Sequence, residues 1–319
     1  MTPLSAIRLE GLTKHYPGVQ ALTDLTLDVP VGSIYGFLGP NGAGKTTTLK
    51  ILGGLIRPTS GSASVAGIPL TEGAAYRRQM GYLAQTPAFY DWMSGRETLA
   101  FVASLAADPS AGESPWIDRV LARVGLADAA DRRTSTYSGG MRQRLGIAQA
   151  LVTRPQVVLL DEPVSALDPI GRREVLDLMT DLKGEATVFY STHILDDVER
   201  VSDHVAIIDH GRLVRAAPTG DLLRSFSKDR LRVSLGGATD DTAAQIASIP
   251  GAVSVDIAGR DGDVRSYLVH IRPDAAAGVQ RDITRLASAG DLTVVENGLV
   301  RIDLEDVFFR LVDSKERAA

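Results

Sequence analysis

The sequence predicts an α/β protein with a largely parallel sheet, followed by a smaller α+β domain. From Ile7 to about Gly220, short apolar runs alternate with helical patterns, which is typical of a sheet covered by helices. A glycine-rich phosphate-binding motif lies between a strand and a helix in this region. After Ser227 the pattern changes to strand, helix, strand, strand, helix, strand, which suggests a ferredoxin-like unit.

The strands expected in the main sheet are short, and several are continuously apolar, as strands buried on both faces are. A less regular, helix-rich stretch from about Thr86 to Thr136 interrupts them. We expect this stretch to form a lobe on the sheet domain. The expected strands are Ile34–Leu38, Gly81–Leu83, Val157–Leu160, Val188–Ser191 and Val205–Ile208.

The chain length predicts two domains or one large one, because 319 residues exceed what one ordinary domain needs. We expect the first domain to cover residues 1–225 and the second to cover residues 228–319. The second closes with a predicted helix whose apolar side chains recur at i, i+3, i+4, i+7 and i+8. These side chains are Leu304, Val307, Phe308, Leu311 and Val312.

Composition excludes several classes of function. Hydrophobic residues make up 44% of the chain and charged residues 23%, which is normal for a globular protein. The formal net charge of −5 supplies no positive field for nucleic acid, and the absence of cysteine excludes disulfides and thiolate metal sites. No stretch reaches the ~20 apolar residues of a spanning helix. A membrane role would therefore require a partner. The amino-terminal residues lack a basic region followed by an apolar run, so we do not expect secretion.

The phosphate motif fits the pattern G-x-x-x-x-G-K-[ST] and lies after the predicted strand IYGFL and before a predicted helix. Its glycines let backbone N–H groups converge on phosphates, and the helix N-terminus adds positive potential. We expect Lys45 to contact the β- and γ-phosphates and Thr46 to ligate Mg²⁺. The expected binding residues are Gly39, Pro40, Asn41, Gly42, Ala43, Gly44, Lys45, Thr46 and Thr47.

Two adjacent acids follow the predicted strand Val157–Leu160. Asp161 emerges at the carboxyl end of that strand, where α/β sheets bind ligands, and we expect it to hold Mg²⁺ directly or through water. Glu162 beside it is placed to accept a proton from an attacking water. An isolated Asp-Glu pair would carry little meaning, but a phosphate loop in the same chain favours this interpretation.

With these motifs, the chain closely resembles the nucleotide-binding subunit of an ABC transporter from residue 4 to about 220. By this resemblance Tyr16 is expected to stack on adenine and Gln85 to touch Mg²⁺ and the lytic water. His193 is expected to contact the γ-phosphate and that water, and the loop ending at Asp168 to cross a dimer interface. The resemblance thus implies ATP and Mg²⁺ as cofactors and ATP hydrolysis as the reaction.

The segment YSGGM resembles the family signature, with Tyr137 for the usual Leu and Met141 for the usual Gln. Ser138, Gly139 and Gly140 open a predicted helix, and a helix N-terminus with small residues is a second anion site. Such a terminus cannot reach a phosphate already enclosed by its own loop. The resemblance therefore implies a head-to-tail dimer in which each signature closes the ATP of the other copy.

The resemblance also implies partners and a location. The expected partners are a second copy of the chain and a multi-span permease, with no nucleic acid, and the expected place is the cytoplasmic face of the cell membrane. The motifs and the terminal segment LEDVFFRLV look like the drug-efflux branch of bacterial ABC ATPases, related to daunorubicin exporters. That branch implies export of a drug, lipid or other small molecule.

Two alternatives remain open at this stage. The chain could serve an importer, with a carboxy-terminal domain that senses cytosolic substrate, as in methionine-type importers. It could also be a soluble ABC ATPase acting on ribosomes or DNA. Those proteins usually carry two such domains or long coiled coils, which this sequence lacks.

Overall fold

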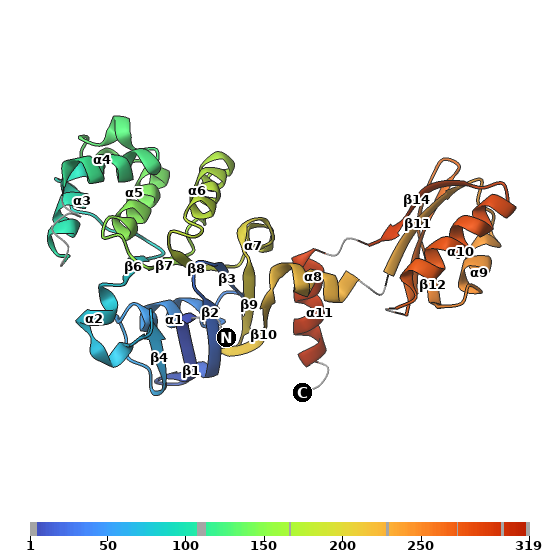
Figure 1. The fold of residues 1–319 in the computed structure, drawn as a ribbon, viewed down its shortest axis with the longest axis horizontal. Coiled ribbons are helices and arrows are strands. Elements are labelled where there is room, and N and C mark those ends of the chain that lie inside the picture. The colour runs from blue at the N-terminus through green and yellow to red at the C-terminus, as the bar shows by residue number, and fades with distance from the viewer. Residues whose placement is uncertain are drawn as a thin grey trace. The chain divides into compact units, whose positions relative to one another are not determined.

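The computed structural model describes residues 5–106, 113–165, 167–227, 230–272, 274–300 and 303–316 (Figure 1). The chain divides into two compact units. The first extends to Thr219 and takes in the chain from Leu311, and the second covers Gly220–Arg310. The division precedes the boundary expected near residue 225, and the last helix is shared between the two units.

The first unit is built on a six-stranded sheet, ordered β10-β9-β3-β8-β7-β6. Neighbouring strands are parallel except for β10, which is antiparallel to β9. The five strands expected from the sequence are confirmed, and β10 is an addition. The strands are β3 (Ile34–Leu38), β6 (Met80–Leu83), β7 (Val157–Asp161), β8 (Thr187–Thr192), β9 (His204–Asp209) and β10 (Arg212–Pro218).

The central strands are buried along their whole length. Every residue of β3, β7 and β8 is buried, which explains why their sequences are continuously apolar until the last residues. Because the three strands are parallel, their carboxyl ends meet at one edge of the sheet. The polar residues at these ends are therefore brought together at that edge.

A second, antiparallel sheet has the order β2-β1-β4-β5. Helix α1 (Lys45–Leu52) contacts strands of both sheets, and its residues Leu49, Ile51 and Leu52 belong to the core cluster that the two sheets share. This sheet was not specified by the sequence analysis. Its strands are β1 (Ser5–Tyr16), β2 (Val19–Pro30), β4 (Ser60–Val65) and β5 (Ile68–Pro69).

The expected helical lobe is present, and it extends beyond the expected end near Thr136, because a third helix over Gly139–Leu151 contacts the two helices within that stretch. Ser94 caps the first of them through a capping box with Glu97. The indole of Trp116 donates a hydrogen bond to the Val152 carbonyl at 2.8 Å, which ties the second helix to the end of the third. The helices are α3 (Gly95–Ser104), α4 (Ser114–Arg123) and α5 (Gly139–Leu151).

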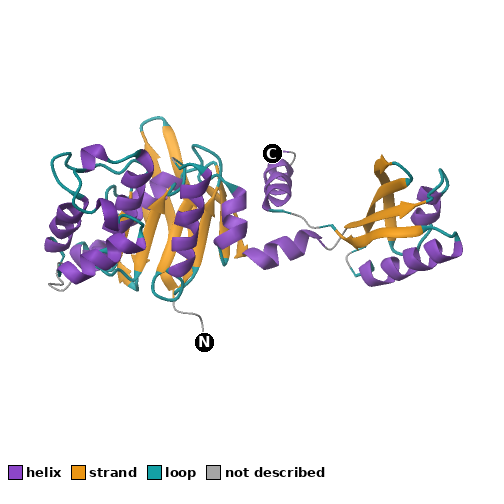
Figure 2. Ribbon diagram, turned by 90° about the horizontal axis from the view of Figure 1, so that it is seen from above, coloured by secondary structure: helices purple, strands orange, loops and turns teal. Residues whose placement is uncertain are grey.

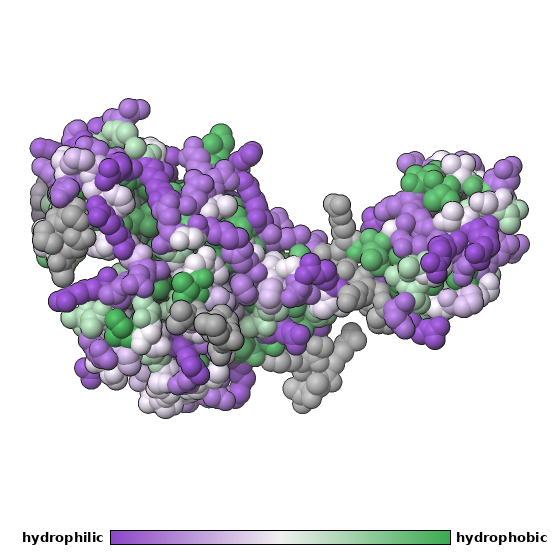
Figure 3. Space-filling model, in the orientation of Figure 1, coloured by the Kyte–Doolittle hydropathy of each residue, from purple (hydrophilic) through white to green (hydrophobic). Residues whose placement is uncertain are grey.

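The remaining helices of the first unit are α2 (Ala74–Arg77), α6 (Pro169–Asp181) and α7 (Leu195–Val201). Figure 2 shows the strands of this unit with helices packed around them. On the face that Figure 3 shows, polar side chains cover most of the lobe, and hydrophobic ones form scattered spots. Scattered apolar side chains of this kind are ordinary for a protein surface.

The second unit contains an antiparallel sheet ordered β12-β13-β11-β14, with two helices on one of its faces (Figure 2). The sheet and helices share a separate core that includes Val233, Tyr267, Val269 and Ile283. The element order is the one expected from the sequence. The elements are β11 (Arg230–Gly236), α9 (Thr242–Ala247), β12 (Ala252–Asp261), β13 (Val264–Ile271), α10 (Ala276–Ala289) and β14 (Thr293–Leu299).

Two further helices are α8 (Thr219–Ser227) and α11 (Leu304–Glu316). The predicted terminal helix is thus confirmed as α11. Leu304 and Val307 are fully buried, and Phe308 is partly buried, as their shared face predicts. The side chain of Val312 lies outside the described residues.

Replacing Gly81 with alanine should destabilise the first unit, because an added Cβ on β6 would lie 1.8 Å from the carbonyl oxygen of Ala150 in α5. We expect the free energy of unfolding, measured by urea denaturation with circular dichroism, to fall by about 2–3 kcal/mol. Gly259→Ala is the matched control, since no atom lies within 4 Å of its added Cβ. Equal stability of the two variants would contradict this packing.

Candidate functional site

The loop between β3 and α1 is shaped by its glycines. Gly42 and Gly44 have φ angles of +83° and +106°, which residues with a Cβ atom rarely adopt. An added Cβ on Gly39 would lie 2.3 Å from the Ile208 carbonyl oxygen on β9. The loop is therefore held closely against the sheet, with the N-terminus of α1 directly behind it.

Lys45 is buried at the start of α1, with its ammonium turned toward the loop. Its Nζ donates hydrogen bonds to the carbonyls of Gly39 at 2.7 Å and Pro40 at 3.2 Å, and lies 3.5 Å from Oε1 of Glu162. Burial lowers the pKa of Lys45, while the nearby Glu162 opposes that shift. The ammonium is thus a point charge fixed between the loop and the end of β7.

Asp161 at the end of β7 is buried, and its two oxygens have different surroundings. Oδ1 accepts hydrogen bonds from Ser191 Oγ at 2.6 Å and Thr46 Oγ1 at 3.2 Å, whereas Oδ2 is buried with no hydrogen-bond partner among the described residues. Burial raises the pKa of Asp161, and the two hydroxyls oppose the shift. A carboxylate oxygen without a partner beside a threonine hydroxyl fits a hard cation such as Mg²⁺.

Glu162 and His193 face each other across neighbouring strand ends. The imidazole Nδ1 lies 3.1 Å from Oε1 and 3.0 Å from Oε2 of Glu162. The side chain of Glu162 is buried, whereas the side chain of His193 is about half exposed. One member of the pair is therefore in the interior and the other is in contact with solvent. Glu162 also has a φ of +51°, which is unusual for a residue with a side chain.

The predicted loop residues, except Gly39 and Ala43, line a cleft of about 280 Å³. Glu162 and Gln85 line the same cleft, so the structure brings these two distant sequence motifs to the phosphate loop. Tyr16 does not line the cleft, but its strand partner Val19 does. The Tyr16 ring is partly exposed, and the Lys14 ammonium lies 5.0 Å from its centroid.

The signature residues lie apart from this cleft, at the N-terminus of α5. Ser138 is the N-cap, and its hydroxyl accepts a hydrogen bond from the Met141 amide at 3.2 Å. Among the described residues, no atom lies within 4 Å of a Cβ added to Gly139, so the terminus is accessible at that residue. The unusual Tyr137 is buried, and its hydroxyl donates to the Ala129 carbonyl at 2.7 Å. Tyr137 therefore contributes to the lobe's packing.

Asp168 is the N-cap of α6 and accepts a hydrogen bond from the Gly171 amide at 2.7 Å. It is exposed and does not line the cleft. Its carboxylate therefore has a local structural use that the family resemblance did not indicate. Ala166, in the same loop, lies outside the described residues.

Two buried side chains at the site were missed by the sequence analysis. Ser191 contacts both acids, and Gln143 of α5 donates a hydrogen bond from Nε2 to the Pro163 carbonyl at 2.9 Å. The signal for Ser191 was its position two residues before His193, at the end of a strand paired with β7. Nothing in the sequence pattern marked Gln143, because its role depends on where α5 packs.

Taken together, these groups form a site for hydrolysis of a bound nucleoside triphosphate. Backbone amides and a buried ammonium are arranged so that they can bind phosphates, a carboxylate and hydroxyl suit a divalent cation, and a second carboxylate can accept a proton from water. The side chain of His193 is about half exposed, so solvent water can reach the site there. The fold and the site define a P-loop nucleoside triphosphatase.

Comparisons with known proteins identify the family. The model of the ABC transporter family matches residues 22–165. The chain is 35% identical to the daunorubicin resistance ATP-binding protein DrrA3 of Streptomyces coeruleorubidus over 98% of both chains. It is 34% identical to the bacitracin transport ATP-binding protein BcrA of Bacillus licheniformis, over 96% of this chain and 97% of the relative.

Solved structures agree with these relatives. A structure of an ATP-binding subunit of an ABC transporter has a TM-score of 0.63 and 30% identity, covering 70% of this chain and 93% of its own. A dimeric ATP-binding cassette with bound ADP and Pi has a TM-score of 0.61 and 25% identity, covering 67% of this chain and 98% of its own.

The chain belongs to the family of ABC transporter ATP-binding proteins, and it is an ATPase of that family. Its relatives include the drug-resistance branch that the sequence analysis indicated. In the part of the chain that the structure describes, no helix combines the length and the apolar character needed to cross a bilayer.

Asp161→Asn should raise the thermal stability of the protein without nucleotide, because it removes a buried charge whose Oδ2 has no described partner. We expect a rise in Tm of about 2–4 °C, which corresponds to about 1 kcal/mol in a unit of this size. The measurement is differential scanning calorimetry in the absence of nucleotide and divalent cation.

Asp168→Asn is the matched control for this prediction. Asp168 is exposed, and asparagine is an equally good N-cap, so its Tm should stay unchanged. A lower Tm for Asp161→Asn than for the control would show that the Asp161 charge stabilises the fold.

Proposed function

We propose that this chain drives the export of a drug, lipid or other small molecule through a separate membrane permease. The observation that carries the proposal is the similarity to drug-resistance and bacitracin-transport ATP-binding proteins along almost the whole chain, including the second unit. A match confined to the first unit would support only the ATPase activity. We place the protein at the cytoplasmic face of the membrane, held there by the permease.

The proposed hydrolysis uses groups in and beside the cleft. Lys45 and backbone N–H groups of the loop that ends at Thr46 bind the β- and γ-phosphates. Thr46, Asp161 and Gln85 would hold Mg²⁺, which when bound neutralises developing phosphate charge. Glu162 accepts the proton of the attacking water, and His193, 3.0 Å from the Glu162 carboxylate, orients the water and the γ-phosphate.

Two copies are proposed to close head to tail around ATP. The N-terminus of α5, with Ser138, Gly139 and Gly140, supplies small residues and first-turn amides, which suit a phosphate. In a single chain these residues do not line the nucleotide cleft. A second copy could therefore contribute them, while Tyr16 stacks on adenine and the loop at Asp168 lies along the interface.

Glu162→Gln should trap this dimer. With no base to take the proton, turnover should fall at least about a hundredfold, while ATP binding by Lys45 is retained. Size-exclusion chromatography with ATP should then show a dimer that is absent with ADP. Lys45→Ala is the control, because it removes the phosphate contact and should leave the protein monomeric. Near-normal hydrolysis by Glu162→Gln would refute the general-base assignment.

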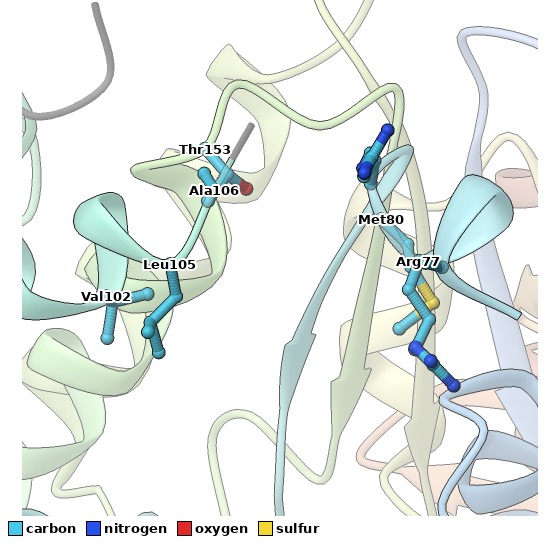
Figure 4. A pocket seen from close by; sticks show the side chains of 8 residues that line it. Arg77, Met80, Val102, Leu105, Ala106 and Thr153 are labelled. Carbon is cyan, nitrogen blue, oxygen red and sulfur yellow. The ribbon is translucent and has the colours of Figure 1, made fainter. Parts of the chain in front are cut away.

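A groove in the first unit is the proposed docking place of the permease. It has a volume of about 600 Å³ and lies between the end of α3 and the segment from α2 to β6 (Figure 4). Val102 and Leu105 lie on one side, and Arg77 and Met80 on the other. Leu105 is largely exposed, so an apolar surface is available beside positive charge.

The chemistry of this groove fits a short amphipathic helix from a cytoplasmic loop of the permease. Its apolar face would cover Val102 and Leu105, and a carboxylate would meet Arg77 or Arg78. Within the described part of the chain, neither arginine forms an ion pair with a carboxylate. The groove is linked to the ATP site through β6, which leads from Met80 toward Gln85.

The double variant Arg77→Glu and Arg78→Glu should weaken attachment to the membrane partner. Affinity purification of the tagged protein from membranes should recover a multi-span protein with the wild type and much less of it with the variant. ATP hydrolysis by the isolated variant should remain. Arg285→Glu is the control, because this arginine is an exposed residue of α10 with only a surface ion pair. Equal recovery from both variants would contradict docking at this groove.

For the second unit we propose a ferredoxin-like domain that stabilises or supports the dimer. Its support is the antiparallel strand order β14-β11-β13-β12 with both helices on one face. An importer would instead be expected to bind its substrate through residues 228–319 and to lose ATPase activity on binding. Loss of the gene should sensitise cells to the exported compound if the export proposal is correct.

A further inference from the structure

We propose that Ser191 is a positioning residue for ATP hydrolysis, whose hydroxyl fixes the Asp161 carboxylate and the Glu162 backbone at the same time. The proposal rests on the roles assigned above to these two acids. Ser191 belongs to β8, is fully buried, and lies directly opposite Asp161 in the parallel register of β7 and β8.

The hydroxyl of Ser191 makes two different hydrogen bonds. It donates to Oδ1 of Asp161 at 2.6 Å and accepts from the amide of Glu162 at 2.9 Å. A hydroxyl has one proton to give and lone pairs to accept with, so both bonds form together. Alanine or valine at this position could make neither bond.

The first bond orients the carboxylate of Asp161. Because Oδ1 is held by Ser191 and Thr46, the carboxylate is fixed in rotation and Oδ2 is left as the oxygen without a described partner. That is the oxygen available to a cation or its water. Loss of the serine bond would leave a single, longer hydrogen bond to Thr46 and let the carboxylate turn.

The second bond holds Glu162 in a strained backbone conformation. A φ of +51° is unfavourable in a residue with a side chain, so surrounding contacts must maintain it. The amide of Glu162 is bound to Ser191, and its carboxylate faces Lys45 and His193. By holding the backbone amide of Glu162, Ser191 thus helps to orient the carboxylate that serves as the general base.

The strand geometry makes the same residue a link to His193. Ser191 and His193 are two residues apart at the end of β8, and they contact the backbone and the side chain of Glu162 respectively. Ser191, His193 and Glu162 therefore link the ends of β7 and β8 through two separate contacts. A shift of either strand end would change the distance between base and histidine.

The test compares Ser191→Ala with Ser191→Thr, which keeps the hydroxyl. For the alanine variant we expect kcat to fall about ten- to hundredfold, the effect of one lost hydrogen bond to a charged group. The Mg²⁺ concentration needed for half-maximal activity should rise. The affinity for ATP without Mg²⁺, measured with a fluorescent ATP analogue, should stay within about twofold, because residues 39–46 are untouched. Threonine should restore most of kcat.

Ser33→Ala is the matched control. Ser33 is also buried in the first unit, and its hydroxyl donates to the Pro30 carbonyl at 2.7 Å, at the start of β3 and thus the opposite end of that strand from the phosphate loop. Its kcat and Mg²⁺ dependence should equal those of the wild type. If Ser191→Ala does not fold, Ser191→Cys, with a weaker donor, should show an intermediate loss.

Three results would overturn the proposal. The first is a wild-type kcat and Mg²⁺ dependence in Ser191→Ala, and the second is a loss of kcat that threonine does not restore. The third is a loss of Mg²⁺-free ATP affinity as large as the loss of kcat, which would indicate general collapse of the site. Glu162→Gln is measured in parallel. If that variant still hydrolyses ATP, the base assignment fails, whereas an inactive Glu162→Gln beside a fully active Ser191→Ala refutes only the role of Ser191.

Discussion

The contact between Lys45 and Glu162 is the interaction on which the rest of the site depends. It joins the start of α1 to the end of β7, two elements far apart in the sequence, through buried groups of opposite charge. A buried ammonium without such a partner would be costly, as would a buried carboxylate. The pair therefore holds the phosphate loop against the sheet, and the neighbouring Asp161, Thr46 and His193 are positioned relative to it.

Much of this arrangement could be predicted from the sequence, because the motifs follow continuously apolar strands. The runs before Gly39, Asp161 and His193 are apolar enough to be central strands, and parallel strands end at one edge. That reasoning places Lys45, Glu162 and His193 together without coordinates. The antiparallel sheet was missed although β2 alternates between buried and exposed residues, which is the pattern of a half-buried strand; its strands carry no functional motif that drew attention to them.

Other parts of the site could not be predicted, for physical reasons that differ by residue. The contacts of Ser191 depend on the register between β7 and β8, which no local pattern encodes. Gln143 reaches Pro163 only because of the way α5 packs against the sheet. Asp168 was assigned by resemblance to an interface, whereas its position as an N-cap follows from the Pro169 that begins α6. For Ser191 and Gln143 a tertiary contact therefore decides the role, whereas the N-cap role of Asp168 is local and follows from the sequence around it.

The tryptophan content gives the lobe of α3, α4 and α5 a property of practical use. The sequence has two tryptophans, and both Trp92 and Trp116 lie in or beside this lobe. Trp92 is mostly exposed, while Trp116 donates to Val152 and has the guanidinium of Arg154 4.4 Å from its ring centroid. With excitation that selects tryptophan over the eight tyrosines, the emission therefore originates in one subdomain and can follow movements of the lobe without any attached label.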